Sequence, residues 1–66
     1  MLKPYNREAV RTRGYKAYCN HVAPSRVYDE VRGIKNFDEK RIEDYVEDWL
    51  IGWTNAMNDA HSGFST

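Results

Sequence analysis

The stretch WLIGWTNAM, residues 49–57, places a glycine between two tryptophans that are four residues apart. Glycine inside a helix costs about 1 kcal/mol relative to alanine, so a helix that carries Gly52 needs a reason for it. A glycine allows another backbone to come close, because it has no side chain. We therefore expect this stretch to be helical and to meet a second helix closely at Gly52.

The residues around this stretch predict one long amphipathic helix over about residues 37–60. Asn36 followed by Glu39 has the pattern of a capping box, and Gly63 is a stop signal. Apolar residues recur at spacings of three and four, which places them on one broad helical face. That face is predicted to hold Ile42, Tyr45, Val46, Trp49, Leu50, Trp53, Ala56, Met57 and Ala60.

The opposite face of this helix is acidic. It is predicted to carry Glu43, Asp44, Glu47 and Asp48. Carboxylates on a solvated helix face mainly serve solubility. Ile51 projects from the same side and is a candidate anchor for a partner helix. This acidic surface is therefore a candidate site for binding another protein.

The N-terminal part of the chain predicts a second long helix over about residues 7–22. Asn6 is a suitable N-cap, and Pro24 prevents the helix from continuing. Small side chains dominate one narrow stripe of this helix, which would allow a partner helix to approach closely. The stripe holds Val10, Gly14, Ala17 and His21.

The two long helices are expected to cross where Gly14 and Gly52 lie, with the two tryptophans on either side of the contact. A short helix over about residues 26–32 would cover one side of the pair. We therefore predict one all-α domain, residues 1–66, built as a small helical hairpin of two long helices with a short intervening helix. The residues assigned to the crossing are Gly14, Ala17, Trp49, Gly52, Trp53 and Ala56.

Length and composition predict a small soluble protein. Sixty-six residues, 41% of them hydrophobic and 30% charged, suit one folded domain near the lower size limit for a useful core. Cys19 is the only cysteine, so no intramolecular disulfide can form, and this favours a reducing cytoplasm. The sequence begins with no apolar signal run, and no segment has the length needed to span a bilayer. We expect a cytoplasmic protein.

The sequence predicts no active site. His21 and His61 have no cysteine or carboxylate at ligand spacing, so no metal site is expected. Cys19 has no evident activating neighbour, and no glycine-rich phosphate loop is present. We therefore expect a non-enzymatic protein without a cofactor or a small-molecule substrate.

Charge is distributed unevenly along a chain whose net charge is zero. Residues 1–28 hold six basic residues against Glu8 alone, whereas residues 29–66 hold four against nine acidic ones. Such asymmetry indicates either a half that binds a polyanion or two halves that pack on each other. The first helix combines cations with aromatic stacking surfaces, which suits RNA. The candidate RNA-binding residues are Arg7, Arg11, Arg13, Tyr15 and Lys16.

Two short motifs resemble those of the ribosome modulation factor family, which has an R-G-Y-x-A element followed by a W-L-x-G-W-x-x-A-M element. The matching residues are Arg13, Gly14, Tyr15 and Ala17, and then Trp49, Leu50, Gly52, Trp53, Ala56 and Met57. The resemblance implies a helical hairpin that binds ribosomal RNA of the small subunit near the messenger exit region. It also implies translation repression in hibernating, paired ribosomes, with Arg13 and its basic neighbours facing RNA.

A second hypothesis remains open, because members of that family are strongly basic whereas this chain is neutral. The connector between the motifs is also longer here and lacks the family's short Cys-Pro-Tyr-type segment. The alternative is a small adaptor or inhibitor, of the kind that a phage or mobile element encodes, which binds a host protein. Its binding surface would be the acidic one: Glu43, Asp44, Glu47, Asp48 and Ile51.

Overall fold

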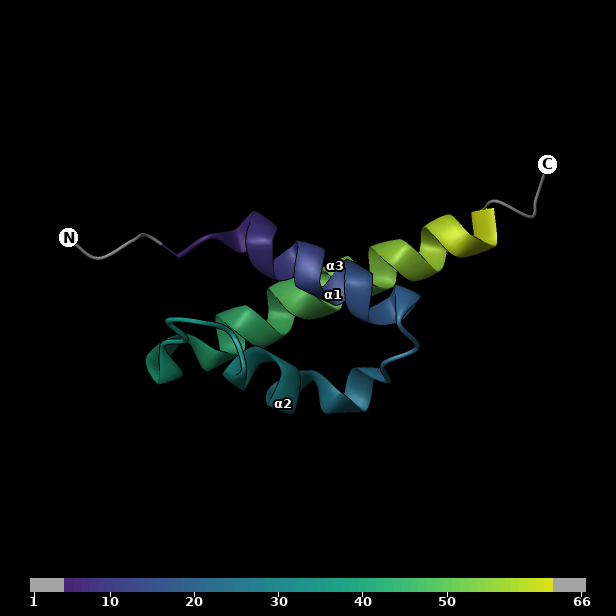
Figure 1. Ribbon diagram of the computed structural model, residues 1–66. Helices are drawn as coiled ribbons and strands as arrows, with labels where there is room; N and C mark the ends of the chain where they lie inside the picture. Colours follow the sequence, from purple (N-terminus) through teal and green to yellow (C-terminus); the bar gives the residue numbers. More distant parts are fainter. Residues whose placement is uncertain (1–4, 63–66) are drawn as a thin grey trace.

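The computed structural model describes residues 5–62, which form a helical hairpin closed by a short helix (Figure 1). The long helices are α1, Arg7–Cys19, and α3, Ile42–Ser62, and the short one is α2, Val27–Arg32. Single 3-10 turns precede α2 and α3: η1, Pro24–Arg26, and η2, Glu39–Arg41. The described part of the chain has no strand. The predicted all-α hairpin of two long helices with a short intervening helix is confirmed.

The first helix begins where the sequence predicts it but ends three residues early. Asn6 caps its start, since the side chain accepts a hydrogen bond from the N–H of Ala9 at 3.1 Å. At its end the backbone turns left-handed at His21, with φ 62°, and the N–H of Val22 donates to the carbonyl of Ala17 at 2.9 Å. This 6→1 bond is a Schellman motif with histidine in the position that glycine usually holds.

The prediction that α1 runs to residue 22 is therefore wrong, and so is the placement of His21 on the stripe of small residues. His21 lies outside the helix and is exposed. The helix ends here because the Schellman motif satisfies its last carbonyl groups before the chain reaches Pro24.

The start of α3 also differs from the prediction. Asp38 is the residue whose side chain caps the entry, accepting from the N–H of Lys40 at 3.0 Å. Asn36 instead sits in a turn with φ 66°, so it is no N-cap. The capping-box prediction is wrong because the chain needs a left-handed residue at position 36 to turn from α2 towards α3. The predicted stop at Gly63 lies outside the described residues.

The crossing of α1 and α3 explains the glycine between the tryptophans. A Cβ added to Gly14 would overlap the carbonyl oxygen of Trp49 and lie 2.8 Å from its carbonyl carbon. A Cβ added to Gly52 would overlap the carbonyl oxygen of Arg11 and lie 2.6 Å from its carbonyl carbon. Each glycine thus faces the backbone of the other helix, and the close approach predicted from the sequence is observed.

The two tryptophans hold different positions at this crossing. Trp49 is 1% exposed and lies in the core with Val31 of α2. Trp53 is partly buried; its indole N–H donates to the carbonyl of Val22 at 2.9 Å, and its ring packs edge-on against Tyr18. Trp49 therefore fills the core, whereas Trp53 holds the chain just after α1 against α3.

Candidate functional site

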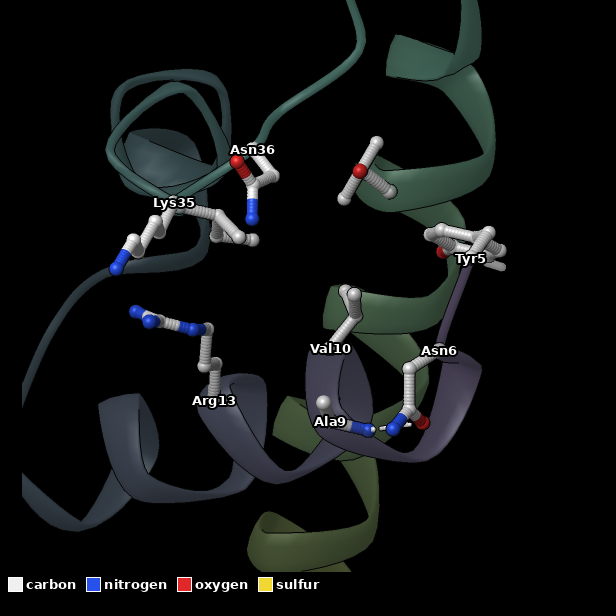
Figure 2. A pocket seen from close by; sticks show the side chains of 9 residues that line it. Tyr5, Asn6, Ala9, Val10, Arg13, Lys35 and Asn36 are labelled. Carbon is white, nitrogen blue, oxygen red and sulfur yellow. Dashed lines mark hydrogen bonds between the residues drawn. The ribbon is translucent and has the colours of Figure 1, made fainter. Parts of the chain in front are cut away.

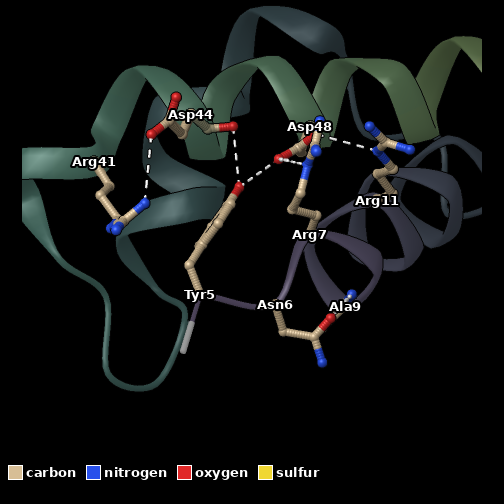
Figure 3. Close-up of polar contacts among 8 residues, drawn as sticks. All are labelled: Tyr5, Asn6, Arg7, Ala9, Arg11, Arg41, Asp44 and Asp48. Atoms are coloured by element: carbon tan, nitrogen blue, oxygen red, sulfur yellow. Dashed lines mark hydrogen bonds and ion pairs between the residues drawn. The ribbon is translucent and has the colours of Figure 1, made fainter. Parts of the chain in front are cut away.

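Two of the predicted RNA-binding residues are engaged within the fold. Arg11 donates from Nε to Oδ1 of Asp48 at 3.1 Å, and Nε of Arg7 lies 3.8 Å from Oδ2 of the same carboxylate (Figure 3). The Arg7 side chain remains 68% exposed and that of Arg11 38% exposed. Both guanidinium groups have an anionic partner already, so they offer less free positive charge to an RNA phosphate than the sequence suggests.

Asp48 is not part of the exposed acidic surface on which the sequence placed it. It is 4% exposed, because α1 crosses directly over this part of α3. Its carboxylate accepts a hydrogen bond from the hydroxyl of Tyr5 at 2.6 Å in addition to that from Arg11. A buried carboxylate needs such partners, since an unpaired buried charge is strongly unfavourable. Asp48 thus binds the first helix and does not face a protein partner.

Tyr5 holds the segment before α1 against α3. Its hydroxyl also lies 3.1 Å from the carbonyl oxygen of Asp44, and its ring packs edge-on against Tyr45. The guanidinium of Arg41 lies 5.6 Å from the ring centroid, within cation–π range. Burial, followed by the hydrogen bond to Asp48 and its negative charge, raises the pKa of Tyr5 well above the usual tyrosine value. The hydroxyl therefore stays a donor at neutral and moderately alkaline pH.

Tyr15 lies on the exposed side of α1, where its hydroxyl donates to Oδ2 of Asp59 on α3 at 2.8 Å. That hydrogen bond, and then the charge of Asp59, raise the pKa of Tyr15. The side chain is 37% exposed and borders a shallow groove of about 320 Å³ between α1 and α3. The groove is lined by Arg11, Thr12, Tyr15, Lys16, Gly52 and Asn55.

Arg13 and Lys16 differ from the other predicted RNA-binding residues. They are exposed, lie one turn apart on α1, and form no ion pair within residues 5–62. Lys16 borders the groove between the long helices, whereas Arg13 lines a separate pocket that also contains Lys35. The structure therefore does not bring all five predicted residues to one site.

The remaining acidic residues of α3 are exposed, as expected, and one flank of this helix carries a shallow apolar depression. Its volume is about 350 Å³, and its lining residues are Glu47, Leu50, Ile51, Thr54 and Asn55. Ile51 is half-buried there beside Leu50. Asn55 also borders the groove between α1 and α3, so the two candidate surfaces adjoin.

Sequence reasoning missed Lys35 and Asn55 as site residues. Lys35 lies in the connector after α2, and no local pattern relates it to Arg13. Asn55 lies between Thr54 and Ala56 on α3, at a position where the helical period only indicates an exposed side chain. Lys35 is recognised as a neighbour of Arg13 only on the surface of the folded protein, because the two residues are far apart in the linear sequence.

The described residues contain no group of three or more histidine, cysteine or carboxylate side chains that could hold a metal ion. Within the same residues, no helix is both long and apolar enough to cross a membrane.

Comparison with known proteins returned no matching family model, curated protein or solved structure. The resemblance to the ribosome modulation factor family therefore rests on the two short motifs, and it stays a hypothesis.

Proposed function

We propose that this chain is a non-enzymatic protein that binds ribosomal RNA on the small ribosomal subunit and thereby represses translation. The observation that carries this proposal is the pair of exposed cations, Arg13 and Lys16, one turn apart on α1 with no ion pair among the described residues. Both residues lie within the RGYKA element, residues 13–17, on which the family resemblance partly rests.

Phosphate binding favours these two side chains over the other candidates. RNA affinity comes largely from cations that neutralise phosphates and release counterions. Arg7 and Arg11 share the carboxylate of Asp48, so RNA would have to compete with an existing partner. Arg13 and Lys16 have no such competitor among the residues that the structure describes, and the ring of Tyr15, 37% exposed and between them in sequence, adds a surface on which a base can stack. The proposed interface therefore consists of Arg13, Tyr15 and Lys16.

The test compares two double variants that remove the same charge from different places. Arg13→Gln/Lys16→Gln removes the proposed contacts, and Arg26→Gln/Lys40→Gln removes two exposed cations outside α1. Association with purified small ribosomal subunits is measured across a salt series. The first variant is expected to lose about tenfold in affinity or more, and its slope of log K against log salt should fall by about one unit for each lost contact. The second is expected to stay within about twofold of the wild type.

Two results would contradict the proposal. If the wild-type protein does not associate with small ribosomal subunits at low salt, the small subunit is excluded as the target. Equal losses in both double variants would mean that overall charge, and not the surface of α1, drives the association. Translation in a cell-free extract, with and without the protein, then tests whether binding represses protein synthesis.

A second candidate function is binding a host protein, as a small phage- or mobile-element-type adaptor or inhibitor would. The depression beside Leu50 and Ile51 favours it, since half-buried aliphatic side chains there adjoin the acidic Glu47. Charge complementarity suggests a partner segment that presents aliphatic and basic side chains. Asp48 does not contribute, because it is buried under α1.

The acidic surface offers a variant that separates the two functions. Neutralising its exposed carboxylates should strengthen RNA binding, because it removes repulsion between like charges. The same change should lower the affinity for a basic protein partner. The variant combines Glu43→Gln, Asp44→Asn and Glu47→Gln and leaves Asp48 intact. Ile51→Asp should abolish binding to a protein partner. Its control is Tyr28→Asp, which changes an exposed aromatic residue on α2. RNA binding that is unchanged in Ile51→Asp supports the first function, and a salt-resistant protein complex that Ile51→Asp abolishes supports the second.

A further inference from the structure

A pocket between the start of α1 and the connector after α2 gathers positive charge from two separate parts of the chain (Figure 2). Its volume is about 180 Å³, which equals that of about six water molecules and is sufficient for a phosphate group with part of its hydration. The lining residues are Tyr5, Asn6, Ala9, Val10, Arg13, Ile34, Lys35, Asn36 and Tyr45. None of them is acidic.

Two cations reach this pocket from different elements. Arg13 extends from α1 and Lys35 from the connector, and Figure 2 shows their charged ends directed towards each other. Neither side chain forms an ion pair within the described part of the chain. Two like charges that face each other repel, and an anion placed between them turns this repulsion into attraction. Both side chains are exposed, so water screens much of the repulsion, and an anion bound between them would gain attraction from both.

Asn36 provides a neutral donor at the same place. Its backbone is left-handed, with φ 66°, a conformation that asparagine tolerates better than most residues but that still carries strain. Figure 2 shows its side-chain amide directed into the pocket, whereas the charged end of Lys35 lies at the edge of the pocket near that of Arg13. An amide NH₂ group can donate two hydrogen bonds to oxyanion oxygens.

The floor of the pocket is apolar. Val10 is 3% exposed and Tyr45 is 6% exposed, and Ile34 lies beside them, half-buried. These apolar side chains form one wall of the pocket, and the exposed side chains of Arg13, Lys35 and Asn36 line the rest of its opening. The site thus combines two cations and an amide donor above an apolar floor.

We propose that this pocket is a phosphate-binding site, held by Arg13, Lys35 and Asn36, that takes one phosphodiester group of the RNA backbone. The RNA part of the proposal rests on the proposed function, whereas the phosphate chemistry rests on the pocket alone. A guanidinium group binds two phosphate oxygens at once, and an ammonium group adds a point charge for a third. The bound backbone would then continue along α1 towards Lys16.

The experiment has an RNA arm and an inorganic phosphate arm. In the RNA arm, affinity for a single-stranded ribosomal RNA fragment is measured for Lys35→Gln and for its control Lys40→Gln, which lies in η2 outside the pocket. Lys35→Gln is expected to bind about tenfold more weakly and to reduce the salt slope by about one unit. Lys40→Gln is expected to stay within about twofold of the wild type.

In the second arm, inorganic phosphate is titrated while the backbone amide resonances of Arg13, Lys35 and Asn36 are followed by NMR. Chloride and acetate at matched ionic strength serve as controls. Phosphate is expected to shift these three resonances in a saturable way, and Lys35→Gln should abolish the saturation. Asn36→Gly should melt at a higher temperature than the wild type, because glycine relieves the left-handed strain, yet bind phosphate more weakly.

The outcomes separate this inference from the proposed function. If RNA affinity falls equally in Lys35→Gln and Lys40→Gln, and phosphate induces no shifts at the pocket, the phosphate site is overturned while the proposed RNA-binding function still stands. If phosphate shifts the resonances in a saturable way but the protein binds no RNA, the phosphate site is supported. The assignment of that phosphate to an RNA backbone, and the proposed function with it, are then overturned. Acetate shifts as large as those of phosphate overturn the assignment in favour of a carboxylate ligand.

Discussion

Gly14 of α1 and Gly52 of α3 each face the backbone of the opposite helix, at the carbonyl groups of Trp49 and Arg11 respectively. The contact is reciprocal, so the two helices touch backbone to backbone along one short segment. A side chain on either glycine would have to displace a whole helix, since backbone atoms cannot rotate away as a side chain does. This relationship sets how closely α1 covers α3, and therefore what it buries.

Gly14→Ala and Gly52→Ala are expected to destabilise the fold by about 2 kcal/mol or more, because the added methyl group meets backbone atoms. In a domain of this size, each 1 kcal/mol lowers the melting temperature by about 4–8 °C. Gly33→Ala is the matched control, since its Cβ would lie 3.5 Å from the carbonyl oxygen of Glu30, an ordinary contact. Thermal unfolding followed by circular dichroism measures all three. An unchanged melting temperature for Gly14→Ala would contradict the crossing.

Asp48→Asn is expected to cost about 1–3 kcal/mol, because it weakens the hydrogen bonds from Tyr5 and Arg11 to a buried carboxylate. Arg7 and Arg11 are partly exposed to solvent, so little ion-pair energy is lost. The loss of the buried hydrogen bonds therefore makes up most of the change in the free energy of unfolding. Glu47→Gln, the neighbouring exposed carboxylate, is expected to change the free energy of unfolding by less than about 0.5 kcal/mol. Urea denaturation provides the comparison. Equal effects of the two substitutions would mean that Asp48 does not anchor α1.

The stability of the fold should fall in alkaline solution through Tyr5. Its folded-state pKa is raised above the unfolded value of about 10, so the folded state keeps the proton when the unfolded state loses it. The corresponding stability is complete below about pH 10 and declines as the pH rises further. Tyr5→Phe should make the loss of stability between about pH 8 and about pH 11 smaller than in the wild type. Tyr28→Phe, at a half-exposed position on α2, serves as control. Equal pH dependence in Tyr5→Phe and wild type would refute the assignment.

His21→Gly is expected to stabilise the protein by about 1 kcal/mol, because His21 holds the left-handed position that ends α1. The neighbouring Asn20 has φ −93°, so Asn20→Gly should bring no such gain. Differential scanning calorimetry on the two variants checks the difference. A melting temperature that drops in His21→Gly would show that the imidazole contributes more than its backbone conformation costs.

The sequence alone predicts a large part of this fold, because the relevant signals are local. The spacing of apolar residues predicts α3, and Asn6 marks the start of α1. The glycines in WLIGWTNAM and RGYKA indicate a close crossing, since a helix rarely carries glycine without a reason. The errors lie at helix ends: His21 and Asn36 both adopt left-handed backbone conformations that glycine, not histidine or asparagine, usually signals.

What the tertiary structure decided is which charged side chains remain available. Helical periodicity puts Asp48 with the acidic residues of α3, yet the close crossing brings α1 over it and turns it into the partner of Arg11. Arg13 forms no ion pair within residues 5–62, and it lines one pocket together with Lys35, which lies 22 residues further along the chain. Periodicity assigns each residue to a side of its own helix, but it contains no information on where a second helix crosses. Burial and pairing of charge depend on that crossing, and so they follow only from the folded chain.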